Sequence, residues 1–191
     1  MYDNSDVHQL ILYCTDLDYF PADIDEFIAQ CQQKQLLANL ISVDETCHYL
    51  LGERFMQYVS FVGCSPYLKL APESEHDENF SSAVLPCQET DIQFFVRHPT
   101  PAPNCPKCKK PQTQINELVQ SSKTTRHNST VVCISCHKEN TLSELDWRRN
   151  AAFCRFYIAI SHIYPKEAIP TNELMDWLSH YSDKHWQYCY V

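Results

Sequence analysis

The sequence predicts an α+β fold, with a mainly antiparallel sheet, packed helices and a small cysteine-rich module inserted into it. Strand-like segments recur in the first half, helical spacing of apolar residues occurs in both halves, and two Cys-x-x-Cys pairs mark the module. With 191 residues and 44% hydrophobic content, the chain is long enough to bury a core. We expect residues 1–98 and 141–191 to complete one domain around an insertion at residues 99–140.

The first predicted element is a strand at residues 7–14, a continuous apolar run of strand-forming residues. Pro21 then suits the first turn of a helix. The apolar stripe of this helix consists of Ile24, Phe27, Ile28 and Cys31. The pattern therefore predicts a buried strand that leads into an amphipathic helix.

Further strand-like segments are rich in β-branched or aromatic residues and are bounded by Pro, Gly, Ser or Asp. They lie at residues 37–41, 57–62, 67–70 and 92–97. Their short spacing favours an antiparallel sheet in the first half of the chain.

A long central helix is expected after the module. Thr141 and Glu144 have the spacing of a capping box. The apolar positions at helical spacing that follow are Leu145, Ala152, Phe153, Phe156, Tyr157, Ile160, Ile163 and Tyr164. Such an apolar helix is expected to pack against the sheet formed by the first half.

The last two expected elements are a helix after Pro170 and a final strand. One face of the helix carries Leu174, Trp177, Leu178 and Tyr181. Trp186, Tyr188 and Tyr190 then alternate with other residues as in a strand. The C-terminal segment is therefore expected to dock onto the fold.

The charge of the chain is unevenly distributed, although its net value is −9. Residues 1–96 hold 3 basic and 16 acidic residues, residues 97–149 hold 9 and 4, and residues 150–191 hold 3 and 4. The cysteine-rich segment is thus a basic island in an acidic protein. This distribution excludes nucleic acid as a partner of the first half and leaves it open for the island.

Eleven cysteines, an odd number spread through apolar segments, indicate reduced thiols rather than a disulfide framework. Residues 1–6 carry acidic groups where a secretory signal would carry basic ones. No apolar run approaches the roughly 20 residues that a membrane span requires. We therefore expect a cytoplasmic protein with no membrane partner, in which paired cysteines bind metal.

The cysteine pairs predict one metal site. Cys105 and Cys108 are separated by 24 residues from Cys133 and Cys136, so two short loops can each direct two thiolates at one centre. Four thiolates in a tetrahedron suit zinc, although an iron centre has the same ligand set. Four protein ligands leave no place for an activated water, so the zinc is expected to be structural and non-catalytic.

Residues 104–140 resemble a zinc ribbon with knuckles of the rubredoxin type. The strands of its hairpin would be residues 114–119 and 129–132. The resemblance implies a metal-stapled hairpin that contacts nucleic acid or protein. Lys109 and His137 depart from the usual knuckle, in which glycine commonly follows the second cysteine. No family is recognised for the rest of the chain.

The basic island provides candidate contacts to a polyanion. These residues are Lys107, Lys109, Lys110, Lys123, Arg126 and Lys138. No aromatic residue is interleaved among them for base stacking, so an acidic protein surface is the simpler partner. Nucleic acid binding through residues 104–149 remains the alternative.

Two weaker patterns could belong to an enzyme. Asp16 and Asp18 follow the first strand and resemble the aspartate pair of haloacid-dehalogenase-type phosphatases, but the chain lacks a Gly-Asp sequence, and turn formation explains both carboxylates. Cys64 lies at an expected turn with no base assigned to it. We therefore expect a non-catalytic protein that acts in interaction, assembly or regulation.

Overall fold

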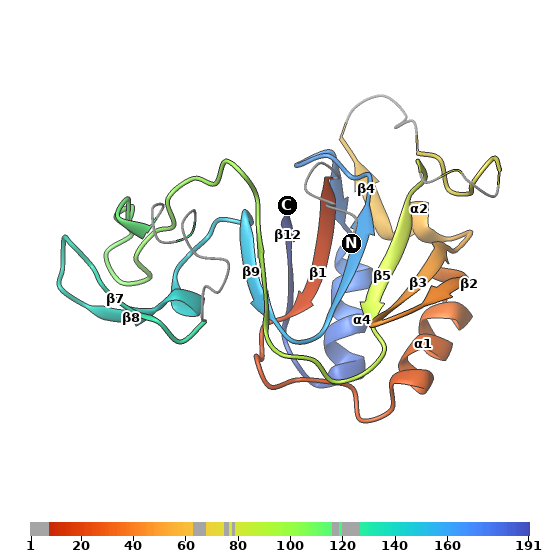
Figure 1. Ribbon diagram of the computed structural model, residues 1–191, viewed down its shortest axis with the longest axis horizontal. Coiled ribbons are helices and arrows are strands. Elements are labelled where there is room, and N and C mark those ends of the chain that lie inside the picture. Colours follow the sequence, from red (N-terminus) through yellow and green to blue (C-terminus); the bar gives the residue numbers. More distant parts are fainter. Residues whose placement is uncertain (1–7, 63–67, 75–76, 78, 116–118, 120–126) are drawn as a thin grey trace.

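A six-stranded antiparallel sheet forms the centre of the computed structural model (Figure 1), which describes residues 8–62, 68–74, 77, 79–115, 119 and 127–191. In spatial order its strands are β12 (Trp186–Tyr190), β1 (Gln9–Cys14), β10 (Tyr157–Ser161), β5 (Ser82–Pro86), β3 (Thr46–Leu51) and β2 (Leu37–Val43). Every neighbouring pair is antiparallel. The predicted α+β class with a mainly antiparallel sheet is confirmed.

Both expected helices at these places are present, as α1 (Ile24–Gln33) and α4 (Asn172–Ser182). The start of α4 agrees with the prediction, but α1 begins at Ile24, so Pro21 precedes the helix and does not belong to its first turn. The Asp23 carboxylate caps α1 by accepting from the Glu26 amide at 2.9 Å. The Thr171 hydroxyl accepts from the Leu174 amide at the start of α4. A one-turn helix, α2 (Phe55–Tyr58), lies between β3 and the next strand, β4 (Val59–Phe61).

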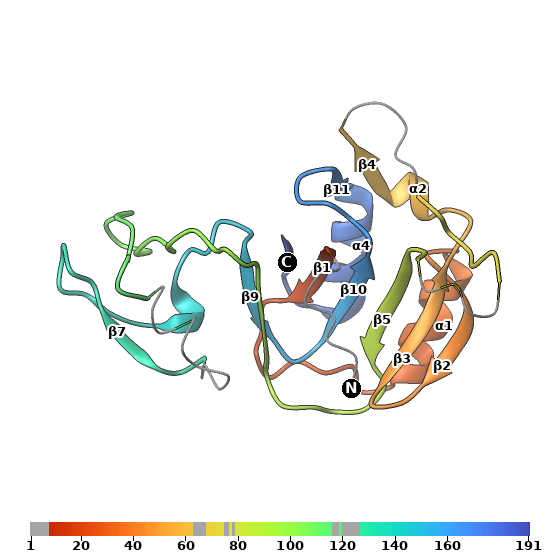
Figure 2. The ribbon, with the colours of Figure 1, turned by 45° about the horizontal axis from the view of Figure 1, so that its top comes forward.

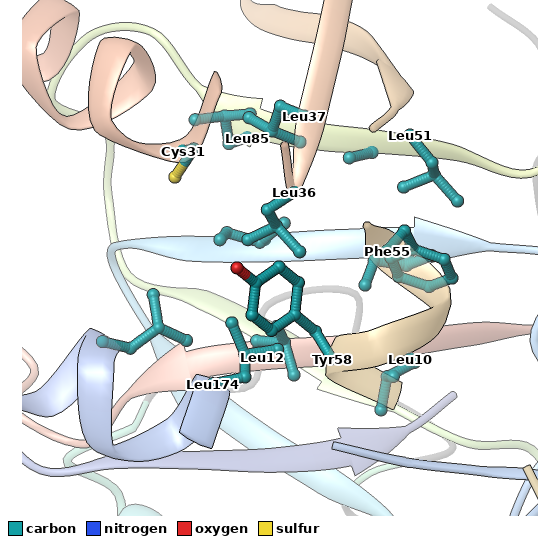
Figure 3. Packing of buried hydrophobic residues seen from close by; sticks show 14 of the residues in the cluster. Leu10, Leu12, Cys31, Leu36, Leu37, Leu51, Phe55, Tyr58, Leu85 and Leu174 are labelled. Carbon is teal, nitrogen blue, oxygen red and sulfur yellow. The ribbon is translucent and has the colours of Figure 1, made fainter. Parts of the chain in front are cut away.

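The helices cover one face of the sheet, where the main core lies. Leu10, Leu12 and Cys14 alternate along β1 and point into this core, as the two-residue period of a strand requires. Figure 3 shows Leu10 and Leu12 beside Tyr58 of α2 and Leu174 of α4. The Tyr58 hydroxyl donates to the Lys34 carbonyl oxygen at 3.1 Å, so this buried hydroxyl has a hydrogen-bond partner.

The opposite face of β1 is also covered. Ile11 packs there with Ala152 and Cys154 of β9 (Ala151–Cys154), and β9 pairs with β6 (Gln93–Val96). Burial on both faces explains why β1 is a continuous apolar run. The remaining pairs are β4 with β11 (Ala168–Pro170) and β7 (Thr130–Val132) with β8 (Glu139–Thr141).

The prediction of a long helix after the module is wrong. Thr141 and Glu144 do form a capping box, but it opens only the one-turn 3-10 helix η1 (Leu142–Glu144). The apolar residues that follow form β9 and β10, whose residues are all buried. A strand buried on both faces has no alternation, so its apolar run fits helical spacing equally well.

Two strand predictions in the first half also need correction. In the segment at residues 57–62, the first two residues belong to α2 and only Val59–Phe61 is a strand. Residues 68–70 are not in a strand, and Tyr67 lies outside the described residues. The strands β3 and β5 were not predicted, although β3 alternates between buried and partly exposed residues in the manner of a half-covered strand.

The cysteine-rich module projects from one side of this body, next to β9 (Figures 1 and 2). A second, smaller core joins it to β6 and β9. Its members are Ile115, Val119, Val131, Leu142, Leu145, Trp147, Ala151 and Phe153. This core includes residues beyond 140, while the domain boundaries at 98 and 140 stay predictions. Among the described residues, no helix is long and apolar enough to cross a membrane.

Candidate metal centre

The four predicted ligands come together in one cluster. The sulfur atoms of Cys105, Cys108, Cys133 and Cys136 all lie within 4.8 Å of one another. Cys105 and Cys136 are 3.8 Å apart and Cys108 and Cys133 are 3.6 Å apart, measured between Sγ atoms. In a tetrahedron with metal–sulfur distances of about 2.3 Å, the sulfur atoms are about 3.8 Å apart. The cluster therefore has the donor set and dimensions that could hold a metal ion such as zinc.

The two Cys-x-x-Cys loops have the same backbone structure. The Cys105 amide donates to the Lys110 carbonyl oxygen, and the Lys109 amide donates to that of Cys105. Cys133 makes the corresponding pair of bonds with Lys138 and His137, again at 2.9 to 3.0 Å. Each loop thereby holds its two thiols on the same side, which is the geometry of a knuckle.

Lys109 and His137 adopt the conformation that glycine would favour. Their φ angles are 60° and 56°, in the left-handed region. The departure from the usual knuckle sequence therefore leaves the knuckle backbone intact, at a cost of roughly 1–2 kcal/mol for each such residue.

Replacing Lys109 tests this conformational cost. Lys109→Gly is expected to retain the metal and to leave the module as stable or up to about 1 kcal/mol more stable, whereas the β-branched Lys109→Val should destabilise it by about 1–2 kcal/mol. Chemical denaturation of the metal-loaded variants measures both changes in stability. Equal stability of the Gly and Val variants would contradict the left-handed conformation.

The cluster is partly shielded from solvent. Cys105 and Cys133 are fully buried, and Cys108 and Cys136 are half-buried. Burial opposes ionisation of Cys133, but amide donation from Cys136 and Ser135 outweighs it and lowers the pKa of this thiol to about 6. The Lys110 amide favours the Cys108 thiolate, yet burial and the neighbouring thiols raise its pKa to about 11. A bound cation would favour ionisation of the Cys108 thiol, because metal binding requires the thiolate form.

Gln112 is a supporting residue that the sequence did not indicate. Its side chain is fully buried, and Nε2 donates to the Cys133 sulfur at 3.3 Å and to the Lys110 carbonyl oxygen at 2.8 Å. It thus links the two knuckles and orients one ligand sulfur, as residues around metal ligands commonly do. A lone glutamine four residues after a Cys-x-x-Cys pair carries no spacing signal.

The hairpin of the predicted ribbon differs from expectation. At residues 114–119 the sequence predicted a strand, but Ile115 and Val119 are helical and both are buried in the small core. The strand at residues 129–132 is present as β7, and its partner is β8, on the other side of the second knuckle. Ile115 and Val119 are four residues apart, a spacing that fits one helix face.

The candidate polyanion contacts are only partly described. Lys107, Lys109 and Lys110 are exposed on the first knuckle, and Lys138 is exposed on the second. Lys123 and Arg126 lie outside the described residues. The four described lysines therefore place positive charge on both knuckles.

In the weaker enzyme pattern, the Asp16 carboxylate serves the turn after β1, whereas the exposed Asp18 carboxylate lies 3.9 Å from the Arg155 guanidinium. Asp16 Oδ1 accepts from the Asp18 amide at 3.1 Å, and Asp16 Oδ2 lies 2.8 Å from Lys184 Nζ. This lysine lowers the pKa of the Asp16 carboxyl. A cavity of about 510 Å³ nearby is lined by Thr15 and Leu17, but by neither aspartate. Cys64 lies outside the described residues.

The described cysteines outside the cluster are free thiols. Burial raises the pKa of Cys31 and Cys189, and burial together with Cys189 raises that of Cys154. These thiols therefore stay protonated and act as small apolar core residues.

Comparisons of the chain with known protein families, with curated proteins and with solved structures gave no significant match. The four-cysteine cluster is consequently the feature from which a function can be argued.

Proposed function

We propose that this protein binds one structural zinc ion through Cys105, Cys108, Cys133 and Cys136 and uses the stapled module to bind another protein. The observation that carries the proposal is the agreement of the Sγ–Sγ distances, 3.6 and 3.8 Å, with a tetrahedral thiolate site. Zinc is favoured over iron by ligand type and knuckle spacing, although both fit four thiolates. In such a site, protein side chains fill all four coordination positions. The metal therefore stabilises the structure of the module and has no vacant position for substrate.

Exposed apolar side chains in and beside the second knuckle support the proposal of a protein partner. Val132 and Ile134 are 49% and 59% exposed, although both are large and apolar. Lys138 closes the same loop, and Lys107 and Lys110 are exposed on the other knuckle. Exposed apolar residues in a module that also carries exposed lysines fit a protein surface that offers an apolar contact bordered by carboxylates.

The nucleic-acid alternative depends on the same lysines. Residues 104–140 contain no Phe, Tyr or Trp side chain on which a base could stack, so binding would depend mainly on phosphate contacts. Affinity for a mixed-sequence RNA or DNA would then fall steeply with salt and with Lys107→Glu/Lys110→Glu.

Crosslinking of the full-length protein in extracts of its source cells, followed by mass spectrometry, tests the protein-binding proposal. We expect a partner with an acidic surface to be crosslinked to wild type and lost with Ile134→Asp, because the added carboxylate would oppose acidic groups on the partner. Val62→Asp is the matched control, since Val62 is 65% exposed and lies outside the module.

Both variants should keep their metal, as elemental analysis can show. A partner that binds wild type and Ile134→Asp equally would place the interface elsewhere. Salt-sensitive binding of nucleic acid without a protein partner would favour the alternative function.

A further inference from the structure

The cavity of about 510 Å³ beside the turn after β1 lies where the cysteine module joins the central sheet. Its walls come from β1 and the turn after it, from β12, from β9 and from residues 143–148. Figures 1 and 2 show β9 next to the module and beside β1. A cavity of this size can hold a small organic molecule.

The lining of the cavity combines apolar and polar surface. Leu17, Leu145 and Phe153 supply apolar surface and belong to the small core or pack against it. On the sheet side, the Tyr13 hydroxyl donates to Gln187 Oε1 at 3.1 Å, which fixes both polar groups in the wall. Such a lining fits a ligand that has an apolar body and one polar end.

Two carboxylates line the same cavity. Glu144 Oε2 accepts from the Thr141 amide at 2.6 Å, and this bond lowers the pKa of the Glu144 carboxyl. Asp146 Oδ1 accepts from the Arg148 amide at 3.0 Å. Both acidic side chains are exposed, so they lie at the mouth of the cavity. Among the residues that the structure describes, neither forms an ion pair.

Nearby cations do not cancel this negative charge. Arg148 also lines the cavity, but its Nη2 donates to the Ala102 carbonyl oxygen at 2.6 Å. The Arg149 guanidinium lies over the Tyr188 ring, 4.2 Å from its centroid, and Lys138 favours ionisation of Glu144 from outside the lining. Two carboxylates and one guanidinium leave the lining with a net charge of −1.

The segment that carries the two carboxylates is held firmly. Asp146 exchanges two backbone hydrogen bonds with Asn104, at 2.8 and 3.0 Å, and Trp147 Nε1 donates to the Leu142 carbonyl oxygen at 2.9 Å. Arg148 and Arg149 follow with φ angles of 51° and 63°, in the left-handed region. Strained backbone of this kind is often found at binding sites, where the surrounding contacts maintain it. A wall that is already ordered loses little entropy when a ligand binds.

We propose that this cavity binds a small organic cation, namely a primary amine attached to an apolar or aromatic body. The ammonium group donates to the carboxylates of Glu144 and Asp146, and the body packs on Leu17 and Phe153. A cationic end matches the net negative lining, whereas an anionic end would meet both carboxylates. The site shares no residue with the four-cysteine cluster, so the inference does not depend on the proposed function.

Three ligands with the same phenylethyl body test the charge preference. They are phenethylamine, 2-phenylethanol and 3-phenylpropionate, which end in a cation, a neutral hydroxyl and an anion. Amide chemical shifts of the metal-loaded protein measure binding. We expect saturable binding of phenethylamine with a dissociation constant of about 1–10 mM, as for a ligand of about nine heavy atoms, and shifts in β9 and residues 143–148. The alcohol should bind about tenfold more weakly, and the anion should not saturate.

Conservative variants test the two carboxylates. Glu144→Gln keeps a side chain suited to the capping box, and Asp146→Asn keeps an oxygen that can accept from the Arg148 amide. Each should weaken phenethylamine binding about threefold or more, and the double variant about tenfold or more. Glu139→Gln is the control, because Glu139 is an exposed carboxylate of β8 outside the cavity, and its dissociation constant should equal that of wild type.

Three results would overturn the proposal. One is the absence of saturable phenethylamine binding up to about 50 mM, well above the range expected for a ligand of this size. Another is equal affinity for the three ligands, which would mean that the lining does not select charge. The last is a double variant that binds phenethylamine as tightly as wild type does, because the amine would then lie elsewhere.

Discussion

Protein purified without added metal is expected to carry about one zinc ion per chain, and Cys105→Ser/Cys133→Ser to lose it. Structural zinc contributes an apparent free energy of roughly 10–16 kcal/mol to small thiolate sites near neutral pH, which is comparable to the whole stability of a domain. The two replaced ligands are the fully buried ones, one from each knuckle. Their loss should therefore remove the metal and unfold the module.

Elemental analysis measures the metal, and hydrogen exchange measures where the fold is lost. Amides of β7 and β8 should lose protection in the variant, while those of β1 and β10 in the central sheet keep it. Cys87→Ser is the matched control, because Cys87 is a half-buried free thiol outside the cluster. Its zinc content should equal that of wild type. A folded wild type without metal would refute the proposed site.

The metal cluster could be predicted from the sequence because its determinants are local. Each of the two loops carries two cysteines with two residues between them. This spacing fixes the set of four sulfur donors independently of the rest of the chain. The left-handed conformation at Lys109 and His137 could likewise be anticipated from the position that glycine usually holds. The role of Gln112 could not, because it depends on the three-dimensional approach of the second knuckle.

The fold between η1 and α4 could not be predicted, because its elements are specified by tertiary partners. Residues 151–154 and 157–161 are strands since β6, β1 and β5 lie beside them. Without that information, two short apolar runs joined by Arg155 and Phe156 satisfy helical spacing. Burial was predicted better than secondary structure, because Phe153, Phe156 and Ile160 of the expected apolar face are buried, although Tyr164 of the same face is 61% exposed.

Phe156→Ala is expected to destabilise the protein by about 3–5 kcal/mol, the range for deleting a large buried aromatic side chain. Phe156 is fully buried in the short connection between β9 and β10. Its ring centroid lies 5.0 Å from that of Phe27, 5.3 Å from that of Phe20 and 6.1 Å from that of Trp186, all in edge-to-face geometry. The variant therefore removes the contact that joins α1, the loop before it and β12.

Chemical denaturation of the metal-loaded protein measures this loss, with two variants as controls. Phe156→Leu fills most of the space and should cost less than Phe156→Ala, while Tyr164→Ala should change stability by only about 0.5 kcal/mol, because Tyr164 is 61% exposed. The zinc content of Phe156→Ala should stay at the wild-type value, since the four cysteines lie outside the core that contains Phe156, in a module that has a smaller core of its own. A loss of metal in this variant would mean that the two cores fold as one cooperative unit, and a cost below about 1 kcal/mol would contradict the aromatic packing around Phe156.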